Sequence, residues 1–282
     1  MARIIAVANQ KGGVGKTTTA VNLAAALAAA KRSVLLVDLD PQGNATMASG
    51  VNKRDVAANG CAVLLEEIPV SEAIVSTAAH FDLLPGGSDL TAAELKLMDS
   101  LAREHRLKEQ LGPVLDRYDT ILIDCPPALN LLTLNALTAA HGVLIPVQCE
   151  YFALEGLSSL LDTIKAVHRR LNPGLQIEGL LRTMYDVRNN LGNEVSAQLS
   201  QHFGDKLLRS IIPRNVRLAE APSHGQPIHL YDRSSRGAIA YIGLAGEMIR
   251  RERTHAGDLI AGSPSRAHEA AVLAAPTDNH QD

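Results

Sequence analysis

The segment that most constrains this chain lies close to its N-terminus. A short, wholly apolar run, Ile4–Ala8, is followed at once by a glycine-rich loop, Gln10–Thr18, and then by an Ala/Leu-rich stretch, Thr17–Ala30. The first run is typical of a strand buried on both faces, and the last is typical of a helix. This order predicts a loop whose backbone N–H groups converge at the N-terminus of the helix.

The same alternation of apolar strands and longer helical patterns continues along the chain. Further strands are expected at Val34–Val37, Phe81–Leu84, Ile121–Ile123, Val143–Val147, Ile177–Met184 and Leu207–Ile212. Helices are expected at Ala92–Leu115, with a break near Gly112–Pro113, and at Leu129–Ala140, Leu157–Leu171, Glu194–Phe203 and Gly237–Arg253. This pattern predicts an α/β fold of the P-loop NTPase type, a mostly parallel twisted sheet with helices on both faces.

Composition limits the domain count and the location. We expect one domain over residues 1–253 and a disordered tail over 254–282, where Ala, Pro, Ser, His and Asp occur without periodicity. Because the sequence shows neither a signal peptide nor an apolar run of ~20 residues, we expect a cytoplasmic protein. The formal net charge is −3, yet Lys165–Arg236 alone carries 11 basic and 6 acidic residues. A basic region on an acidic body can contact phosphate backbones locally.

The loop has the chemistry of a site for ATP and Mg²⁺. Glycines let backbone N–H groups approach phosphate oxygens, Lys16 adds a full charge, and the hydroxyl of Thr17 can complete a Mg²⁺ shell. Gln10 replaces the first glycine of the usual G-x-x-x-x-G-K-[ST] pattern, and Lys11 adds a second lysine. A Rossmann dinucleotide site is a weaker alternative, because G-x-G-x-x-G is absent.

Four segments carry a resemblance to a known family. The run KGGVGKTT resembles the deviant Walker A motif of the ParA/MinD ATPases. Val37–Asn44 is similar to their switch I segment, and Ile121–Pro127 to their Walker B strand and switch II. Ile212–Ser223 resembles a signature of the ParA/Soj chromosome-partitioning branch. The resemblance covers about Ala2 to Arg250 and implies a Mg²⁺-dependent ATPase.

The resemblance also implies roles for individual residues. Lys11 would reach the phosphates of a partner subunit in a nucleotide-sandwich dimer, Gly12 would face the opposing loop, and Asp40 would position the attacking water. The catalytic set is then Lys11, Lys16 and Asp40, and the metal set is Thr17, Asp38 and Asp124. The implied ATP-binding residues are Lys11, Gly12, Gly13, Val14, Gly15, Lys16, Thr17, Thr18, Pro213 and Asn215. Taken alone, Asp38 and Asp124 could equally be cap or turn residues after their strands.

Partners follow from the same resemblance. It implies an ATP-bound homodimer that binds double-stranded DNA without sequence preference, through Arg188 and Arg217, and so associates with the nucleoid. It also implies a ParB-type centromere-binding protein that stimulates hydrolysis. The alternative without a DNA-binding role is that both arginines are solvated or ion-paired surface residues.

Two other functions are weighed against DNA partitioning, whether of a chromosome or a plasmid. A MinD-type positioning ATPase would need a basic amphipathic terminal helix, whereas His268–Pro276 is short and weakly apolar, so no stable membrane association is expected. A metabolic P-loop enzyme such as a reductase iron protein would need paired cluster cysteines, and Cys125 and Cys149 show no such spacing.

Overall fold

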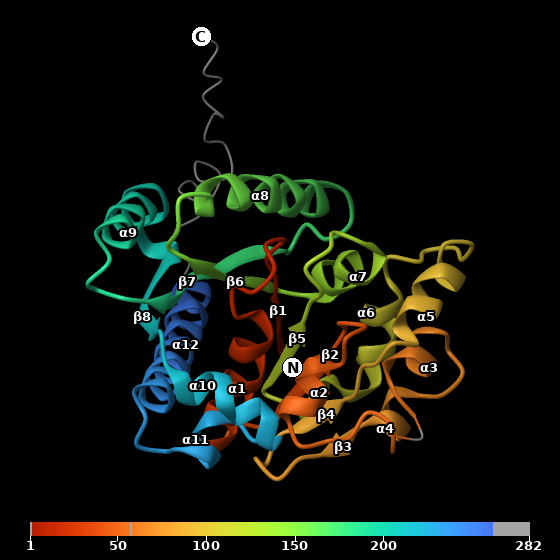
Figure 1. Ribbon diagram of the computed structural model, residues 1–282. Coiled ribbons are helices and arrows are strands. Elements are labelled where there is room, and N and C mark those ends of the chain that lie inside the picture. The colour runs from red at the N-terminus through yellow and green to blue at the C-terminus, as the bar shows by residue number, and fades with distance from the viewer. Residues whose placement is uncertain (1, 57, 262–282) are drawn as a thin grey trace.

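A computed structural model describes residues 2–56 and 58–261, which form a layered α/β domain around one sheet (Figure 1). The strands run in the order β3-β4-β2-β5-β1-β6-β7-β8. All neighbours are parallel except β3 and β4. The strands are β1 (Arg3–Val7), β2 (Val34–Asp38), β3 (Val75–Ser76), β4 (Asp82–Leu84), β5 (Thr120–Asp124), β6 (Gly142–Gln148), β7 (Gln176–Tyr185) and β8 (Leu207–Pro213). The predicted fold class is confirmed.

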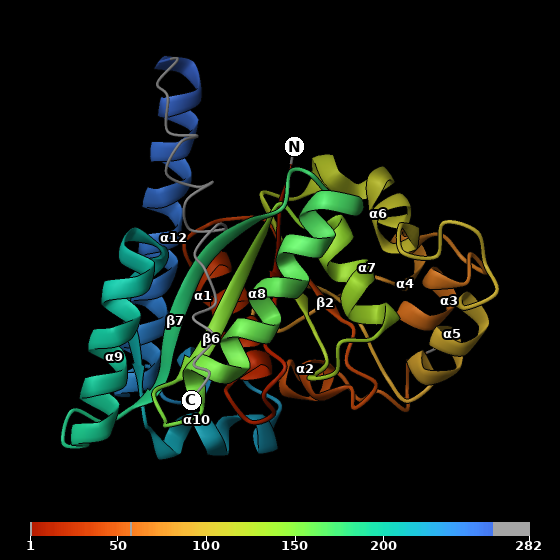
Figure 2. The same cartoon turned by 90° about the horizontal axis from the view of Figure 1, so that it is seen from above.

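Helices cover both faces of this sheet (Figures 1 and 2). One face carries α1 (Lys16–Ala29) and α12 (Arg236–Ala261), with α10 (Val216–Glu220) and α11 (Ile228–Tyr231) close by, and α2 (Asn44–Ala48) follows β2. The opposite face carries α3 (Gly60–Leu64), α4 (Val70–Ala73), α5 (Leu90–Leu97), α6 (Arg106–Leu111), α7 (Leu131–Ala139), α8 (Ala153–Arg170) and α9 (Asn190–Phe203).

Two aliphatic cores result from this layering. Along β1, Ile4 and Ala6 pack into the core under α3 to α9, while Ile5 and Val7 pack into the core under α1 and α12. Successive strand side chains point to opposite faces, so both sets had to be apolar. This explains why the buried strands show continuous apolar runs instead of alternation.

The register of the sheet brings three strand ends together. Asp38 at the end of β2 and Val7 at the end of β1 both lie opposite Asp124, the last residue of β5. In parallel α/β sheets, ligands bind at the carboxyl ends of the strands where the strand order reverses. The sheet therefore places the glycine loop, which follows β1, beside two carboxylates.

The helix predicted over Ala92–Leu115 is wrong in its middle. Helix α5 ends at Leu97, α6 begins at Arg106, and between them Ala102 has a left-handed φ of 51°. The buried amide of Asn135 on α7 bonds this break, because it accepts from Leu107 N (3.0 Å) and donates to Arg103 O (2.8 Å). A partner distant in sequence thus replaces hydrogen bonds that a continuous helix would make.

The C-terminal helix also differs from its expected end. Helix α12 continues to Ala261, past the predicted domain boundary at Arg253, and Figure 2 shows it extending beyond the body of the domain. The rest of the predicted tail, 262–282, lies outside the described residues. Within the described part of the chain, no helix has the length and apolarity needed to cross a membrane.

Replacing Asn135 with Ala tests the tie across the α5–α6 break. The change leaves buried N–H and C=O groups without partners, so the free energy of unfolding should fall by about 2–3 kcal/mol. Urea denaturation followed by circular dichroism measures this. The exposed Asn52, whose side chain bonds only within its own turn, gives the control Asn52→Ala. Equal stability losses in the two variants would contradict the assigned role.

Candidate active site

The glycine loop forms an open cradle at the end of β1. Gly13 and Gly15 have left-handed φ angles of 73° and 87°, which a side chain would strain, and α1 begins directly after Gly15. No side chain caps α1, and its first turn contains no acidic residue. The N–H groups of that turn are therefore available to an anion, and the helix dipole favours negative charge there.

Lys16 lies inside this cradle. It is only 7% exposed, and its Nζ donates to the carbonyl of Lys11 at 3.2 Å. Burial lowers the pKa of Lys16, while the nearby charges of Asp124 and Asp40 oppose that shift. A desolvated ammonium with only a carbonyl partner can bind phosphate oxygens strongly.

Two contacts from elsewhere in the chain hold the loop in place. The hydroxyl of Thr183, near the end of β7, donates to the carbonyl of Val14 at 2.8 Å. Asn9 donates to Pro146 O on β6 and accepts from the Lys11 N–H. Val14, predicted to bind ATP, is itself buried, so it contributes its backbone to the loop.

Asp124 is the residue that fits a metal ion. It is fully buried, and neither carboxylate oxygen has a hydrogen bond of good geometry within the described residues, although the Thr17 hydroxyl lies close enough to favour its ionised form. Burial and the adjacent charge of Asp38 raise the pKa of Asp124 well above its usual value, while the Thr17 hydroxyl and Lys16 oppose this. An unpaired buried carboxylate needs a cation, and carboxylate and hydroxyl oxygens are ligands that Mg²⁺ prefers.

Asp38 lies beside Asp124, but its oxygens are already used. Oδ2 accepts from the N–H and the hydroxyl of Thr46, at 2.8 and 2.7 Å, and Oδ1 accepts from Asp40 N at 3.2 Å. Burial raises the pKa of Asp38, while these hydrogen bonds lower it. The structure thus places Asp38 as the anchor of the segment from Asp40 to Thr46. Gly86 packs against this anchor so closely that a Cβ there would lie 2.4 Å from Asp38 O.

Asp40 points a carboxylate toward the ligand space. Its Oδ1 accepts from Gln42 N at 2.9 Å, a local turn that fixes the side chain, and the residue lines the cavity next to Lys16 and Thr17. Since Asp38 holds the backbone on both sides of it, Asp40 is well positioned for contact with a water near a bound phosphate.

A cavity of about 670 Å³ extends from the loop to the end of β8. Its polar end is formed by the loop glycines, Lys16, Thr17, Thr18 and Asp40. Its other end is formed by Ile212, Pro213, Asn215, Leu218 and Tyr241. Asn215 Oδ1 accepts from Leu218 N at 3.2 Å, which leaves the amide group of Asn215 free to donate. A site that is charged at one end and apolar at the other fits a nucleotide.

The sequence analysis did not anticipate Tyr241 or Thr183. Tyr241, on α12, is fully buried, and its hydroxyl lies 3.2 Å from the Thr19 hydroxyl on α1. In sequence it is one apolar position in an amphipathic helix, and Thr183 is one residue of a strand. No local pattern distinguishes either from an ordinary core residue, so only the tertiary structure reveals their positions.

Lys11 does not line the cavity, although its neighbour Gly12 does. Its Nζ is 2.9 Å from Glu150 Oε2, and both side chains are partly exposed. Gly12 is exposed, and a Cβ built on it would meet nothing within 4 Å. Within one chain, Lys11 therefore has an ion-pair partner, whereas no neighbouring atom requires a glycine at position 12.

The two arginines predicted to bind DNA are both ion-paired. Arg188 contacts Asp186 through two nitrogens, at 2.9 and 2.7 Å. Arg217 lies 2.8 Å from Glu220 and 3.7 Å from Asp232. Both arginine side chains are exposed, so these pairs are accessible to solvent. The three cysteines, Cys61, Cys125 and Cys149, are free.

Comparison with known proteins agrees with this geometry. The family model described as an AAA domain matches residues 2–177. The sporulation initiation inhibitor protein Soj of Bacillus subtilis is 53% identical over 88% of this chain and 98% of its own length. The chromosome partitioning protein ParA of Myxococcus xanthus is 49% identical over 89% of each chain.

A solved structure adds a bound ligand to the comparison. It is the cobyrinic acid a,c-diamide synthase of Mycobacterium smegmatis with ADP and magnesium. It is 39% identical to this chain, has a TM-score of 0.80, and covers 90% of this chain and 97% of its own.

Replacing Lys16 with Ala tests the cradle. The variant loses a buried charged contact to the phosphates, so affinity for ATP should fall by roughly a hundredfold or more. Isothermal titration calorimetry measures this, with Lys96→Ala, an exposed lysine on α5, as the control. Unchanged heat and affinity in Lys16→Ala would remove the loop from the binding site.

Replacing Asp124 with Asn tests the metal-site assignment. The raised pKa of Asp124 means that its ionised form opposes folding, and this penalty appears as the pH rises through that pKa. Without nucleotide at pH 7.5, Asp124→Asn should melt roughly 2–4 °C above wild type, the response to about 1 kcal/mol in a domain of this size. The difference should shrink toward pH 5.

Differential scanning fluorimetry between pH 5 and pH 7.5 measures the difference in melting temperature and its change with pH. Added Mg²⁺ with ATP should stabilise the wild type more than Asp124→Asn. The exposed Asp99, changed to Asn, provides the control for loss of a carboxylate. A variant that melts below wild type at pH 7.5 would show that Asp124 has partners of its own.

Proposed function

Since the chain belongs to the ParA/Soj family of chromosome-partitioning ATPases and is itself an ATPase that uses ATP and Mg²⁺, we propose that it segregates DNA as an ATP-dependent dimer. In this proposal two copies enclose ATP between them and bind double-stranded DNA without sequence preference. Hydrolysis, stimulated by a ParB-type centromere-binding protein, then releases the DNA.

The observation that carries the proposal is the position of Lys11. Its side chain does not line the cavity of its own chain, and its ammonium lies 2.9 Å from Glu150. Beside it, Gly12 leaves open space where any other residue would place a side chain. A lysine and a side-chain-free position at the rim suit close contact with a second copy. A cation from the other subunit would stabilise charge that develops on the transferred phosphate.

Hydrolysis then divides among few residues. Lys16 and the N–H groups of the first turn of α1 would bind the phosphates, and Thr17 and Asp124 would hold Mg²⁺. When bound, Mg²⁺ neutralises charge on the phosphate oxygens. Asp40 orients the attacking water and can accept its proton, while Asp38 holds the Asp40 segment through Thr46. Pro213 and Asn215 form the wall for the adenine base.

The basic region favours DNA as the surface on which this ATPase works. Arg188 and Arg217 lie within the segment Lys165–Arg236, which is the basic part of an otherwise acidic chain. One copy offers few phosphate contacts, and a dimer doubles them. Because each contact releases counterions, the dimer should bind more tightly and with a steeper salt dependence. Dimerisation by ATP thus controls DNA binding, and we place the protein in the cytoplasm on the nucleoid.

A membrane-associated role of the MinD type is the second candidate, and no observation in the described residues favours it. The segment that would carry it, His268–Pro276, lies outside those residues. Flotation with anionic liposomes, compared with retention on duplex DNA under the same ATP conditions, separates the two functions.

Replacing Asp40 with Ala tests the proposal directly. The variant keeps the phosphate cradle and loses the carboxylate that faces the water, so ATP should bind and turnover should fall at least about a hundredfold, the scale of general-base loss. Dimers should therefore accumulate with ATP. Size-exclusion chromatography with light scattering, followed by DNA retention of each fraction, measures both effects.

Lys16→Ala serves as the matched control, because it should remain monomeric under the same conditions. An Asp40→Ala variant that stays monomeric with saturating ATP would overturn the dimer. Dimers that pass over DNA without retention would overturn the DNA-binding part of the proposal.

A further inference from the structure

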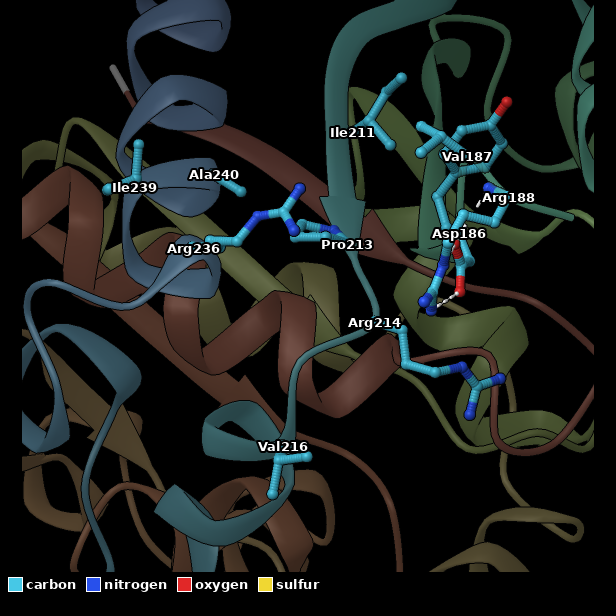
Figure 3. A pocket seen from close by; sticks show the side chains of 11 residues that line it. Asp186, Val187, Arg188, Ile211, Pro213, Arg214, Val216, Arg236, Ile239 and Ala240 are labelled. Atoms are coloured by element: carbon cyan, nitrogen blue, oxygen red, sulfur yellow. Dashed lines mark hydrogen bonds and ion pairs between the residues drawn. The ribbon is translucent and has the colours of Figure 1, made fainter.

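A second cavity, of about 830 Å³, adjoins the nucleotide cavity (Figure 3). It lies between the end of β7, the end of β8 and the first turns of α12. Its wall is formed by Tyr185, Asp186, Val187, Arg188, Ile211, Pro213, Arg214, Val216, Arg236, Ile239 and Ala240. Three arginines and one acidic residue line it, so an anion is the ligand that its charge favours.

One of these arginines is largely neutralised inside the cavity wall. Arg188 makes two hydrogen bonds to Asp186, drawn as dashed lines in Figure 3. These bonds hold the pKa of Asp186 well below its usual range. The pair as a whole contributes little net charge.

Arg214 and Arg236 are different. Both are exposed, and within the described residues neither side chain has a hydrogen bond or ion pair, although the charge of Arg214 helps to lower the pKa of Asp186. Figure 3 shows Arg236 reaching from α12 toward Pro213, and Arg214 leaving the end of β8. Arg236 is also the first residue of α12, where the helix dipole disfavours a cation. A structural role does not explain a free arginine at that position.

The rest of the wall is apolar and unusually exposed. Val187 and Val216 are each 71% exposed, and Ile239 is 61% exposed. A ligand that suits this surface presents anions separated by less polar groups. The sugar–phosphate backbone of DNA has this alternation, and most protein–DNA hydrogen bonds are made to it.

The two cavities share part of one wall. Pro213, Arg214 and Val216, at the β8–α10 junction, line both, whereas Arg236 lines only the second. Arg217, by contrast, lines neither cavity and is held by Glu220 and Asp232. Arg236 therefore contacts only the second cavity, whereas Arg214 contacts both.

We propose that the second cavity binds the phosphate backbone of DNA through Arg214 and Arg236, with Arg214 shared between the DNA and the nucleotide. The proposal rests on the DNA-binding function above and assigns it to these two side chains. It also makes the β8–α10 junction the place where the nucleotide and DNA sites meet.

Fluorescence anisotropy with a labelled duplex tests it, using full-length protein with ATP and a separate ATP titration of each variant. Arg236→Ala should weaken DNA binding by roughly tenfold, a lost charged hydrogen bond, and leave ATP affinity unchanged. Arg214→Ala should lower both affinities. Each variant should also reduce the salt dependence by about one released counterion per copy. Arg236→Lys should recover most of the binding.

The controls separate this proposal from the function on which it rests. Arg54, an exposed arginine in the turn at 52–55 that lines neither cavity, gives the charge-matched control Arg54→Ala. Wild type that fails to bind DNA with ATP would overturn the function itself. Wild type that binds DNA, with Arg236→Ala equal to Arg54→Ala, would overturn only the assignment of the cavity.

Discussion

Asp124 ends the central strand β5 fully buried, with both carboxylate oxygens lacking hydrogen bonds of good geometry inside the described residues. Burying an ionised carboxylate without partners is unfavourable in free energy, and groups on the neighbouring elements partly stabilise its charge. Lys16 approaches from the loop after β1, and the Thr17 hydroxyl opposes the rise in its pKa. In the proposed mechanism, Mg²⁺ with the nucleotide would supply the positive charge that this carboxylate needs. Binding energy and folding energy are therefore linked at this carboxylate.

The neighbouring carboxylate, Asp38, is stabilised in a different way. Asp38 is equally buried, yet it accepts hydrogen bonds from Thr46 and from Asp40 N. Asp38 therefore holds the segment that carries Asp40, and a side chain at position 86 would clash with Asp38. In the proposed mechanism, Asp124 would bind the metal, while Asp38 makes the segment that carries Asp40 rigid. Rigid support of this kind is what positions a reacting group.

The sequence predicts those features of the fold and the site that depend on short, local sequence patterns. The phosphate loop, the strand before it and Asp124 at a strand end follow from spacing alone, because strand, turn and helix periodicities are local properties. The break at 98–105, the Asp38–Thr46 anchor and the Tyr241–Thr19 contact do not, since each depends on partners brought together by the fold. Tyr241 and Thr19 are 222 positions apart. Two-residue β3 was missed for a simpler reason: it is too short to carry a pattern.

The ion pairs of the arginines could not be predicted from the sequence either. A resemblance can assign Arg188 and Arg217 to DNA, but it cannot show that both carry acidic partners or that Arg214 and Arg236 do not. Exposed ion pairs are weak, so DNA could displace Glu220 from Arg217 at small cost in free energy. Arg217 must lose its ion pair before it can bind DNA, whereas Arg236 has no ion pair to lose. A phosphate bound to Arg236 would also reduce the repulsion between this cation and the positive end of α12. Of charges equally near a phosphate, the unpaired one contributes more, which favours the second cavity, lined by Arg236, as the main DNA contact of the proposal.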